Sequence, residues 1–298
     1  MKHFYLIILL FCNVALYGQV DAYLNEYRIT RISDFDKERN LIKESRHLSE
    51  LLLPFFQDSL LHVRQKAYSF LYQKGMDVNS SEKAPYIIRL LKGCEDSNGG
   101  IAGQNLIWLS SFNKEDFTVD AKEQVDNLLR RDHIPHRKRL IMLAGYVGAG
   151  REMLNRQLIQ PGLSSNERWY VHLALARMGD ARSAEFCAQT VQTLQLNNDL
   201  VEYVMPDLIY TRQKILLNIC IDHLNSDESA CTSADPDNER SMPCGYRILE
   251  LIAPVIEDFP FRTSAIGGLD VPDYRQALPV ARQWFRDNPD YRIRMNSF

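Results

Sequence analysis

The feature that most constrains the fold is an apolar helical pattern that recurs along the first two thirds of the chain. The four segments that carry it are 63–75, 102–113, 136–148 and 167–179. Each ends in Gly or Asn, the residues that tolerate the left-handed conformation that closes a helix. The end positions are separated by 38, 35 and 31 residues. Because one hairpin cannot bury its apolar face alone, this recurrence predicts stacked helical hairpins.

A second helical stretch follows each of these segments, and short polar connectors separate the two. The second stretches are 84–92, 121–131, 151–160 and 181–194. An arginine stands eleven residues before the closing glycine in three of the four segments, as Arg64, Arg137 and Arg168. The second segment has Ala102 at this place. The regular offset indicates a role that repeats from one hairpin to the next.

The clearest unit is residues 167–182, with the sequence ERWYVHLALARMGDAR. Its arginine, its alanine-rich apolar stripe and the Gly-Asp before a second helix resemble HEAT-type α-helical repeats. The resemblance covers about Leu48 to Leu194 and fades beyond. It implies an all-α protein, an α-solenoid of stacked antiparallel helical hairpins with a capping C-terminal helix. The alternative is an irregular helical bundle.

The pattern predicts five parts in the chain. They are a signal peptide at 1–18, a helical lead-in at 19–45, repeats at 46–225, a polar loop at 226–243 and a helical cap at 244–298. In the cap, the last helix starts near Asp273 and is expected to turn five apolar residues inward. These are Ala277, Val280, Ala281, Trp284 and Phe285.

The N-terminus reads as a secretory signal. Lys2 precedes nine uninterrupted apolar residues, Phe4 to Cys12, which suit a signal-peptide core but are too short to span a bilayer. Small residues follow at Gly18 and Ala22, so cleavage is expected after Gly18 and no later than Ala22. We therefore expect a secreted bacterial protein that resides in the periplasm and has no membrane span after signal removal.

After removal of the signal, five cysteines remain, so at least one thiol is free or pairs between chains. Cys231 and Cys244 flank a polar loop of twelve residues, whose one apolar anchor is Met242, and are the expected disulfide if the compartment is oxidising. Cys220, which lies in an apolar run, is the alternative disulfide partner for either of these two cysteines. Cys187 also lies in an apolar helical pattern and is expected to be buried. No CxxC spacing occurs, which argues against zinc and thioredoxin-type chemistry.

The sequence contains no signature of nucleic-acid binding or of a phosphate-binding loop. The net charge of −3 and the pI of about 6.2 argue against nucleic-acid binding. The glycine-rich stretch 145–150 has the spacing GxxGxG after a helical pattern, so it reads as a helix-closing turn and not as a phosphate loop. We therefore expect no catalytic, cofactor or metal site.

The residues most suited to a binding surface are cations and large aromatics on the repeated helices. They are Arg64, Trp108, Arg137, Arg168, Trp169 and Tyr170. Two alternative roles are open for the arginines. Either each pairs with an acidic residue of the neighbouring repeat, or together they form a charged stripe on the concave surface. The aromatics likewise have two alternative roles, packing in the core or forming a binding surface.

These features favour a scaffold that binds another protein through its concave surface, since solenoids present extended surfaces of this kind. The alternative is an enzyme on a helical toroid that acts on envelope glycans, which requires paired carboxylates in a cleft. A structural envelope component is the third possibility.

Overall fold

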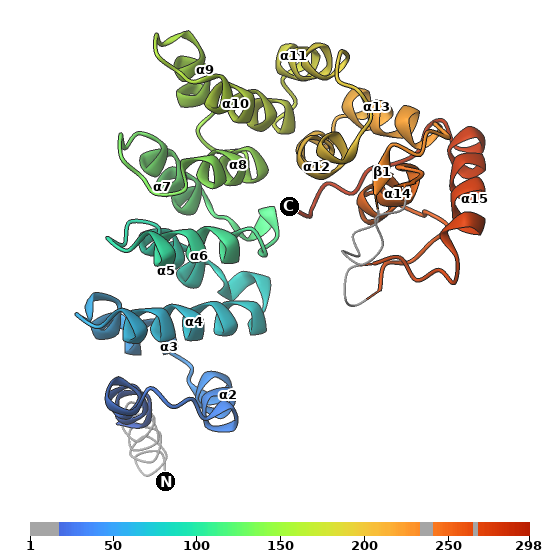
Figure 1. The fold of residues 1–298 in the computed structure, drawn as a ribbon. Coiled ribbons are helices and arrows are strands. Elements are labelled where there is room, and N and C mark those ends of the chain that lie inside the picture. The colour runs from blue at the N-terminus through green and yellow to red at the C-terminus, as the bar shows by residue number, and fades with distance from the viewer. Residues whose placement is uncertain (1–17, 233–240, 265–267) are drawn as a thin grey trace. The chain divides into compact units, whose positions relative to one another are not determined.

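The structure, a computed structural model, describes residues 18–232, 241–264 and 268–298. The predicted signal peptide up to residue 17, and part of the polar loop, lie outside these ranges. The described chain is all-α apart from one pair of two-residue strands (Figure 1). It forms two compact units, Met1–Leu143 and Ala144–Phe298. Within the described residues, no helix combines the length and apolar character needed to span a membrane.

The first unit is built from short helices in chain order. They are residues 18–30, α2 (Phe35–Glu44), α3 (Leu48–Leu51), η1 (Leu53–Gln57), α4 (Leu61–Asp77), η2 (Ser80–Glu82), α5 (Ala84–Gly93), α6 (Gly99–Leu109), η3 (Lys114–Asp116) and α7 (Val119–Leu129). Helix α5 packs against α4, α6 and α7, while α4 also contacts α2 and α6. The fully buried side chains at these contacts include Phe70, Leu71, Ile87 and Leu90. The predicted apolar stripes thus form the core of this unit.

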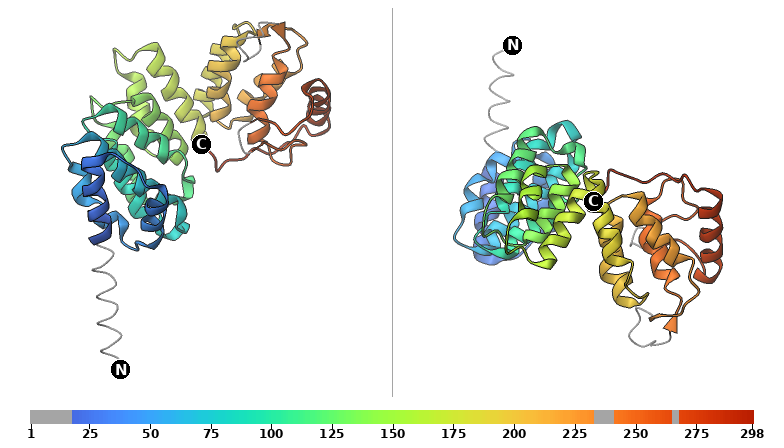
Figure 2. Two further views of the ribbon diagram at one scale, coloured as in Figure 1. Left: turned by 60° about the horizontal axis from the view of Figure 1, so that its bottom comes forward. Right: turned by 90° about the horizontal axis from the view of Figure 1, so that it is seen from above.

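Helix α8 (Arg137–Val147) begins in the first unit and ends in the second. The remaining elements are α9 (Arg151–Ile159), α10 (Ser165–Arg177), α11 (Ala181–Val191), the π-helical turn η4 (Leu200–Val204), α12 (Met205–Tyr210), α13 (Lys214–Leu224), β1 (Cys231–Thr232), β2 (Ser241–Met242), α14 (Gly245–Ile252), η5 (Ala253–Val255) and α15 (Tyr274–Asp287). Helix α10 packs against α9, α11 and α12, and α14 against α12, α13 and α15 (Figure 2). Several of these contacts join helices that follow one another in the chain, such as α9 with α10 and α13 with α14.

Two of the four predicted closing residues end their helices as expected. Gly148 and Gly179 have φ of 72° and 89°, the left-handed conformation. For the other two the prediction was wrong. Helix α4 continues past Gly75, where an added Cβ would lie 3.0 Å from Phe112, so this glycine permits close packing. Asn113 has φ of −67° and begins the turn η3.

The last helix was predicted correctly in position, but two of its five predicted inward residues are not buried, since Trp284 is half-buried and Val280 is exposed. Ala277, Ala281 and Phe285 are buried, together with Leu278. Val280 is 50% exposed, so its inward placement was wrong. The physical reason is the helical period, because the stripe through Leu278, Ala281 and Phe285 leaves Val280 on the opposite side.

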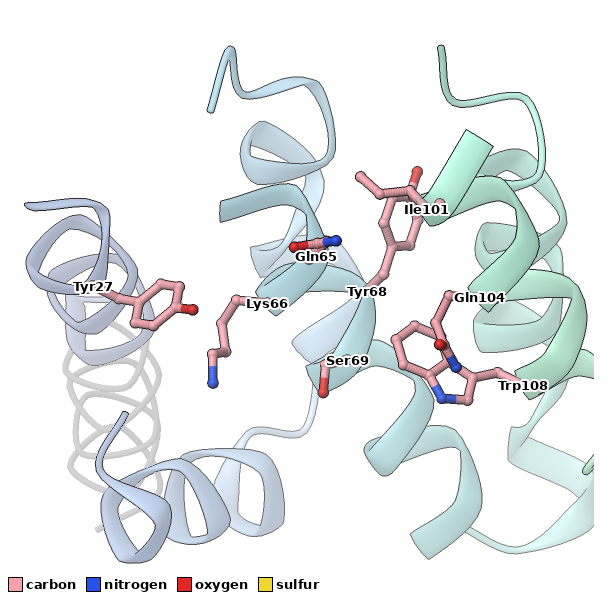
Figure 3. Close-up of a pocket in the computed structure, with 9 residues that line it drawn as sticks. Tyr27, Gln65, Lys66, Tyr68, Ser69, Ile101, Gln104 and Trp108 are labelled. Carbon is pink, nitrogen blue, oxygen red and sulfur yellow. The ribbon is translucent and has the colours of Figure 1, made fainter. Parts of the chain in front are cut away.

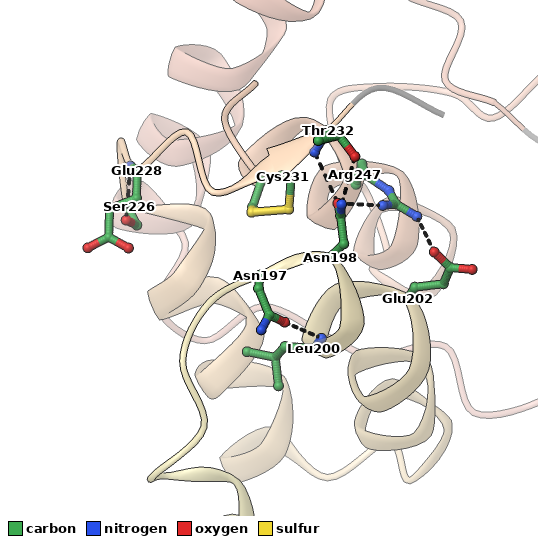
Figure 4. Close-up of a disulfide and its surroundings, with 10 residues drawn as sticks. Asn197, Asn198, Leu200, Glu202, Ser226, Glu228, Cys231, Thr232 and Arg247 are labelled. Carbon is green, nitrogen blue, oxygen red and sulfur yellow. Dashed lines mark hydrogen bonds and ion pairs between the residues drawn. A yellow bond between two sulfur atoms is a disulfide. The ribbon is translucent and has the colours of Figure 1, made fainter. Parts of the chain in front are cut away.

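A disulfide joins Cys231 to Cys244 beside the short ladder of β1 and β2 (Figure 4). The amide of Asn198 holds this hairpin to the helices. Its side-chain oxygen accepts from the backbone N–H of Thr232 at 3.1 Å and from Arg247 Nη1 at 3.1 Å. Its nitrogen donates to Thr232 Oγ1 at 2.7 Å. The other cysteines of the described chain, Cys94, Cys187 and Cys220, are buried thiols.

Candidate functional site

A cavity of about 410 Å³ opens on the first unit between the helix of residues 18–30, α4 and α6. Its lining comes from all three helices and is mostly uncharged (Figure 3). The lining residues are Tyr27, Gln65, Lys66, Tyr68, Ser69, Gly100, Ile101, Gln104 and Trp108. We call this cavity the groove.

Aromatic rings and side-chain amides dominate the groove. Tyr27 lies on the helix of residues 18–30, and Trp108 lies on α6, with Gln65 and Gln104 between them (Figure 3). Both glutamines are exposed to solvent. The Trp108 ring stacks on Tyr72, with centroids 5.1 Å apart and planes inclined by 9°. This stacking fixes the indole on one wall while leaving it part exposed.

The cation of the lining is already neutralised. Lys66 Nζ donates to Glu38 Oε1 at 2.7 Å and to Ser33 Oγ at 2.8 Å, and it lies 4.8 Å from the centre of the Tyr27 ring. Glu38 is buried and also accepts a hydrogen bond from Tyr23. Burial and this hydrogen bond raise the pKa of Tyr23. The network ties α4 to α2 and to the helix of residues 18–30, and thereby positions Tyr27.

The buried Tyr68 forms the floor of the groove. Burial is the main cause that raises the pKa of its phenol, followed by the negative charge of Asp96. Helix α5 approaches this ring closely, because a Cβ added to Gly93 would lie 2.6 Å from Tyr68 Cε1 and 2.5 Å from Asn105 Nδ2. The floor is thus a packed and neutral surface.

The groove is lined by aromatic rings, side-chain amides and one lysine. Its described lining contains no Asp or Glu, whereas glycoside hydrolysis uses two carboxyl groups. Over the described ranges, no group of three or more His, Cys, Asp or Glu is placed to hold a metal ion. Rings supply flat apolar contact area, and the amides supply both donors and acceptors.

The three arginines at the shared offset perform the same structural task. Each donates to backbone carbonyls of the segment before its own helix: Arg64 to Asp58 O at 2.7 Å, Arg137 to Arg131 O at 2.9 Å, and Arg168 to Leu158 O at 3.1 Å. Those carbonyls lie at or near helix ends, where they lack partners within the helix. Arg64 additionally forms a two-bond ion pair with Asp96, at 2.9 and 3.2 Å.

The three predicted aromatics have different surroundings. Trp108 lines the groove. Trp169 donates from Nε1 to Asp207 Oδ2 at 2.9 Å, which links α10 to α12. Tyr170 is buried, with 8% of its surface exposed. Of the predicted surface residues, the groove therefore contains Trp108 alone.

The other residues that line the groove were not predicted from the sequence. Tyr27 lies in the segment assigned to the lead-in, and Gln65 and Gln104 carry no motif that distinguishes them from ordinary solvated glutamines. The one available signal was at Gln104, which lies four residues before Trp108 on α6 and therefore on the same helix face. In comparisons with known proteins, no family model and no curated protein matches the chain.

Proposed function

We propose that this chain is a secreted helical-repeat protein of the periplasm that binds an extended segment of another protein in the groove. The observation that carries the proposal is the lining itself, in which exposed amides alternate with Tyr27 and Trp108 on three neighbouring helices. Protein interfaces are enriched in such aromatic residues.

We further propose that the helices stack as a HEAT-like solenoid. Its support is the packing of helix pairs that follow one another in the chain, among them α4 with α5, α5 with α6, α9 with α10 and α10 with α11. The shared arginine offset adds to it, since Arg64, Arg137 and Arg168 each bond to the carbonyls that precede their own helix. A repeat that keeps one polar contact in successive hairpins is expected to conserve its stacking geometry as well.

The expected occupant is an extended segment with apolar or aromatic side chains and little charge. An extended backbone exposes N–H and C=O groups that Gln65 and Gln104 can pair with. The ammonium of Lys66 is engaged by Glu38, so the groove offers no free charge to a highly acidic ligand. Trp108 would act as the main anchor, because tryptophan is a frequent hot spot in protein interfaces.

Secretion draws support from two features. The apolar run near the N-terminus has the length of a signal-peptide core. The Cys231–Cys244 disulfide suits an oxidising compartment. Cleavage after Gly18 would also leave the buried residues Val20, Tyr23 and Leu24 in the mature chain.

Site-specific photo-crosslinking in envelope fractions tests the proposal. A photoreactive residue is placed at Gln65 or Gln104 in the groove, and at the exposed Asn127 of α7 as the control. We expect one protein adduct shared by both groove positions, absent at Asn127 and lost when Trp108→Ala is added. Adducts that appear equally at all three positions, or no protein adduct at all, would refute binding in the groove.

A further inference from the structure

The last five residues of the chain are held in an unusual way. Every backbone carbonyl from Arg294 to Phe298 accepts a hydrogen bond from a side chain of the same unit. Arg212 donates to Arg294 O at 3.0 Å and Phe298 O at 3.1 Å, and Arg177 donates to Met295 O at 3.0 Å and Ser297 O at 2.7 Å. Tyr146 donates its hydroxyl to Asn296 O at 2.8 Å. We call residues 294–298 the tail.

The side chains that bind the tail are themselves buried and fixed. Arg177 is 6% exposed and Arg212 is 5% exposed. Each also donates to a helix carbonyl, since Arg177 Nη1 bonds to Tyr210 O at 2.6 Å and Arg212 Nη1 bonds to Ile209 O at 2.5 Å. Burial, followed by the charge of Arg177, lowers the pKa of Arg212 to about 10. Two cations are therefore buried close together.

An aromatic pocket receives the final side chain. The Phe298 ring lies 5.3 Å from the ring of Tyr146 and 5.4 Å from that of Tyr210, measured between centroids. The Arg177 guanidinium lies 5.5 Å from the centres of both tyrosine rings. One buried cation thus supports the two rings that contact Phe298. We call Tyr146, Arg177, Tyr210 and Arg212 the clamp.

Most hydrogen bonds to the tail reach its backbone, and Arg212 also donates to Ser297 Oγ at 3.2 Å. Asn296 and Ser297 are exposed, and Met295 and Phe298 are each 40% exposed. Any extended segment presents the same row of carbonyls, so the clamp selects for an extended backbone and for an aromatic last side chain. In addition, Arg212 has φ of 56°, a strained conformation for a residue other than glycine. Strain of this kind concentrates at functional sites.

We propose that the clamp is a peptide-binding site for an extended segment of a partner protein with an aromatic side chain at its last bound position, and that the tail occupies this site as an internal competitor. The proposal is independent of the groove, since every clamp residue belongs to the second unit. The partner segment would reproduce the carbonyl contacts of residues 294–298. A basic residue at the last position would be rejected by the two buried cations.

The test uses the full-length chain and a fluorescent peptide with the sequence of residues 291–298, YRIRMNSF. In wild type the tail competes at an effective concentration of roughly millimolar, so peptide binding is weak. Phe298→Ala weakens the tail but leaves the clamp intact, and we expect it to bind the peptide at least tenfold more tightly than wild type. Val280→Ala, an exposed apolar change in the same unit, should behave as wild type.

The clamp itself is tested in the same background. Adding Arg212→Gln to Phe298→Ala should abolish peptide binding. If that double variant does not fold, Phe298→Ala with Tyr146→Phe removes one donor and should weaken binding several-fold. A peptide with lysine in place of its final phenylalanine should not bind.

Three results would overturn the proposal. The first is no binding of the peptide by Phe298→Ala, which would make the tail a structural element alone. The second is equal binding with and without Arg212→Gln or Tyr146→Phe. The third is a wild-type dimer that Phe298→Ala dissociates, which would assign the clamp to the tail of a second copy.

Discussion

Buried ionic contacts connect segments of the first unit that lie about 30 residues apart in the sequence. Three of them pair Lys66 with Glu38, Arg64 with Asp96, and Lys83 with Asp116, at sequence separations of 28, 32 and 33. These separations are close to the recurrence of 31 to 38 residues in the sequence. The side chains are largely excluded from water, so each pair depends on keeping its partner.

Asp116→Asn is expected to destabilise the protein by about 3 kcal/mol, because it leaves the ammonium of Lys83 buried without its counter-charge. Asp116 also accepts from the backbone N–H of Asn113 at 3.2 Å. Urea unfolding followed by helical circular dichroism measures the change. Asp126→Asn removes a more exposed helix pair with Arg130 and should cost about 0.5 kcal/mol or less. Equal losses in the two variants would contradict the role given to burial.

His172 makes stability depend on pH. Burial, followed by the charge of Arg168, lowers its pKa below the ordinary value of 6.5. The ring stacks on Phe186, with centroids 3.9 Å apart, and Nδ1 lies 3.1 Å from Ser183 Oγ. At pH values between the lowered pKa and 6.5, the unfolded chain binds more protons at His172 than the folded chain does. The contribution of His172 to the free energy of unfolding is therefore lost as the pH falls below about 6.5.

His172→Gln should therefore flatten the decrease in melting temperature between pH 7 and pH 5, in comparison with wild type. The exposed His133→Gln serves as the matched control and should leave the profile unchanged. A profile for His172→Gln that remains parallel to wild type would show that this histidine does not contribute.

Individual residues of the candidate sites were predicted less well from the sequence than whole helices were. Trp108 was predicted for a binding surface because a large aromatic on a repeated helix is conspicuous, and it lines the groove. Arg177 and Arg212 were not, because their bonds to the tail span separations of 82 to 120 residues and end on backbone carbonyls. Every residue has a backbone carbonyl, so a hydrogen bond to that carbonyl does not depend on the residue type. The clamp therefore has no sequence motif.

Whole helices were far more predictable. The apolar period located α4 to α11 to within a few residues, because burial of one face is what makes a short helix stable. Closing residues were predicted less well. Gly148 and Gly179 end their helices, but Gly75 serves close packing inside α4, a use of glycine that sequence alone does not distinguish.

The helix of residues 18–30 sharpens the expected cleavage site. Val20 is fully buried, with Tyr23 and Leu24 beside it. Cleavage after Ala22 would remove Val20 from the core, whereas cleavage after Gly18 would retain it. N-terminal sequencing of envelope-purified protein should therefore begin at Gln19. A chain that begins at Tyr23 would contradict this packing argument, and an intact Met1 would contradict secretion.

The disulfide is expected to stabilise the region around β1 and β2. The two cysteines are 13 residues apart, and closing a loop of this size contributes about 3 kcal/mol in the chain-entropy description. The double change Cys231→Ser and Cys244→Ser should lower stability by up to that amount. Peptide mapping without reduction should recover Cys231 and Cys244 as one linked peptide, and alkylation of both without reduction would exclude the bond.

At the scale of the whole molecule, the two compact units carry different candidate sites. The groove belongs to the first and the clamp to the second, although the sequence assigns one series of repeats to residues 46–225. Both sites suit an extended protein segment, the groove through amides and rings, the clamp through two buried arginines. The central claim is that the groove binds such a segment.

Isothermal titration of the mature protein with the partner segment that cross-links to Gln104 tests this claim most directly. Loss of an aromatic anchor costs about 1–3 kcal/mol, so Trp108→Ala should weaken binding roughly five- to 150-fold. The control Trp284→Phe, a change within the aromatic cluster of Phe259 and Phe285, should bind as wild type does. Equal affinities of wild type and Trp108→Ala would contradict the account.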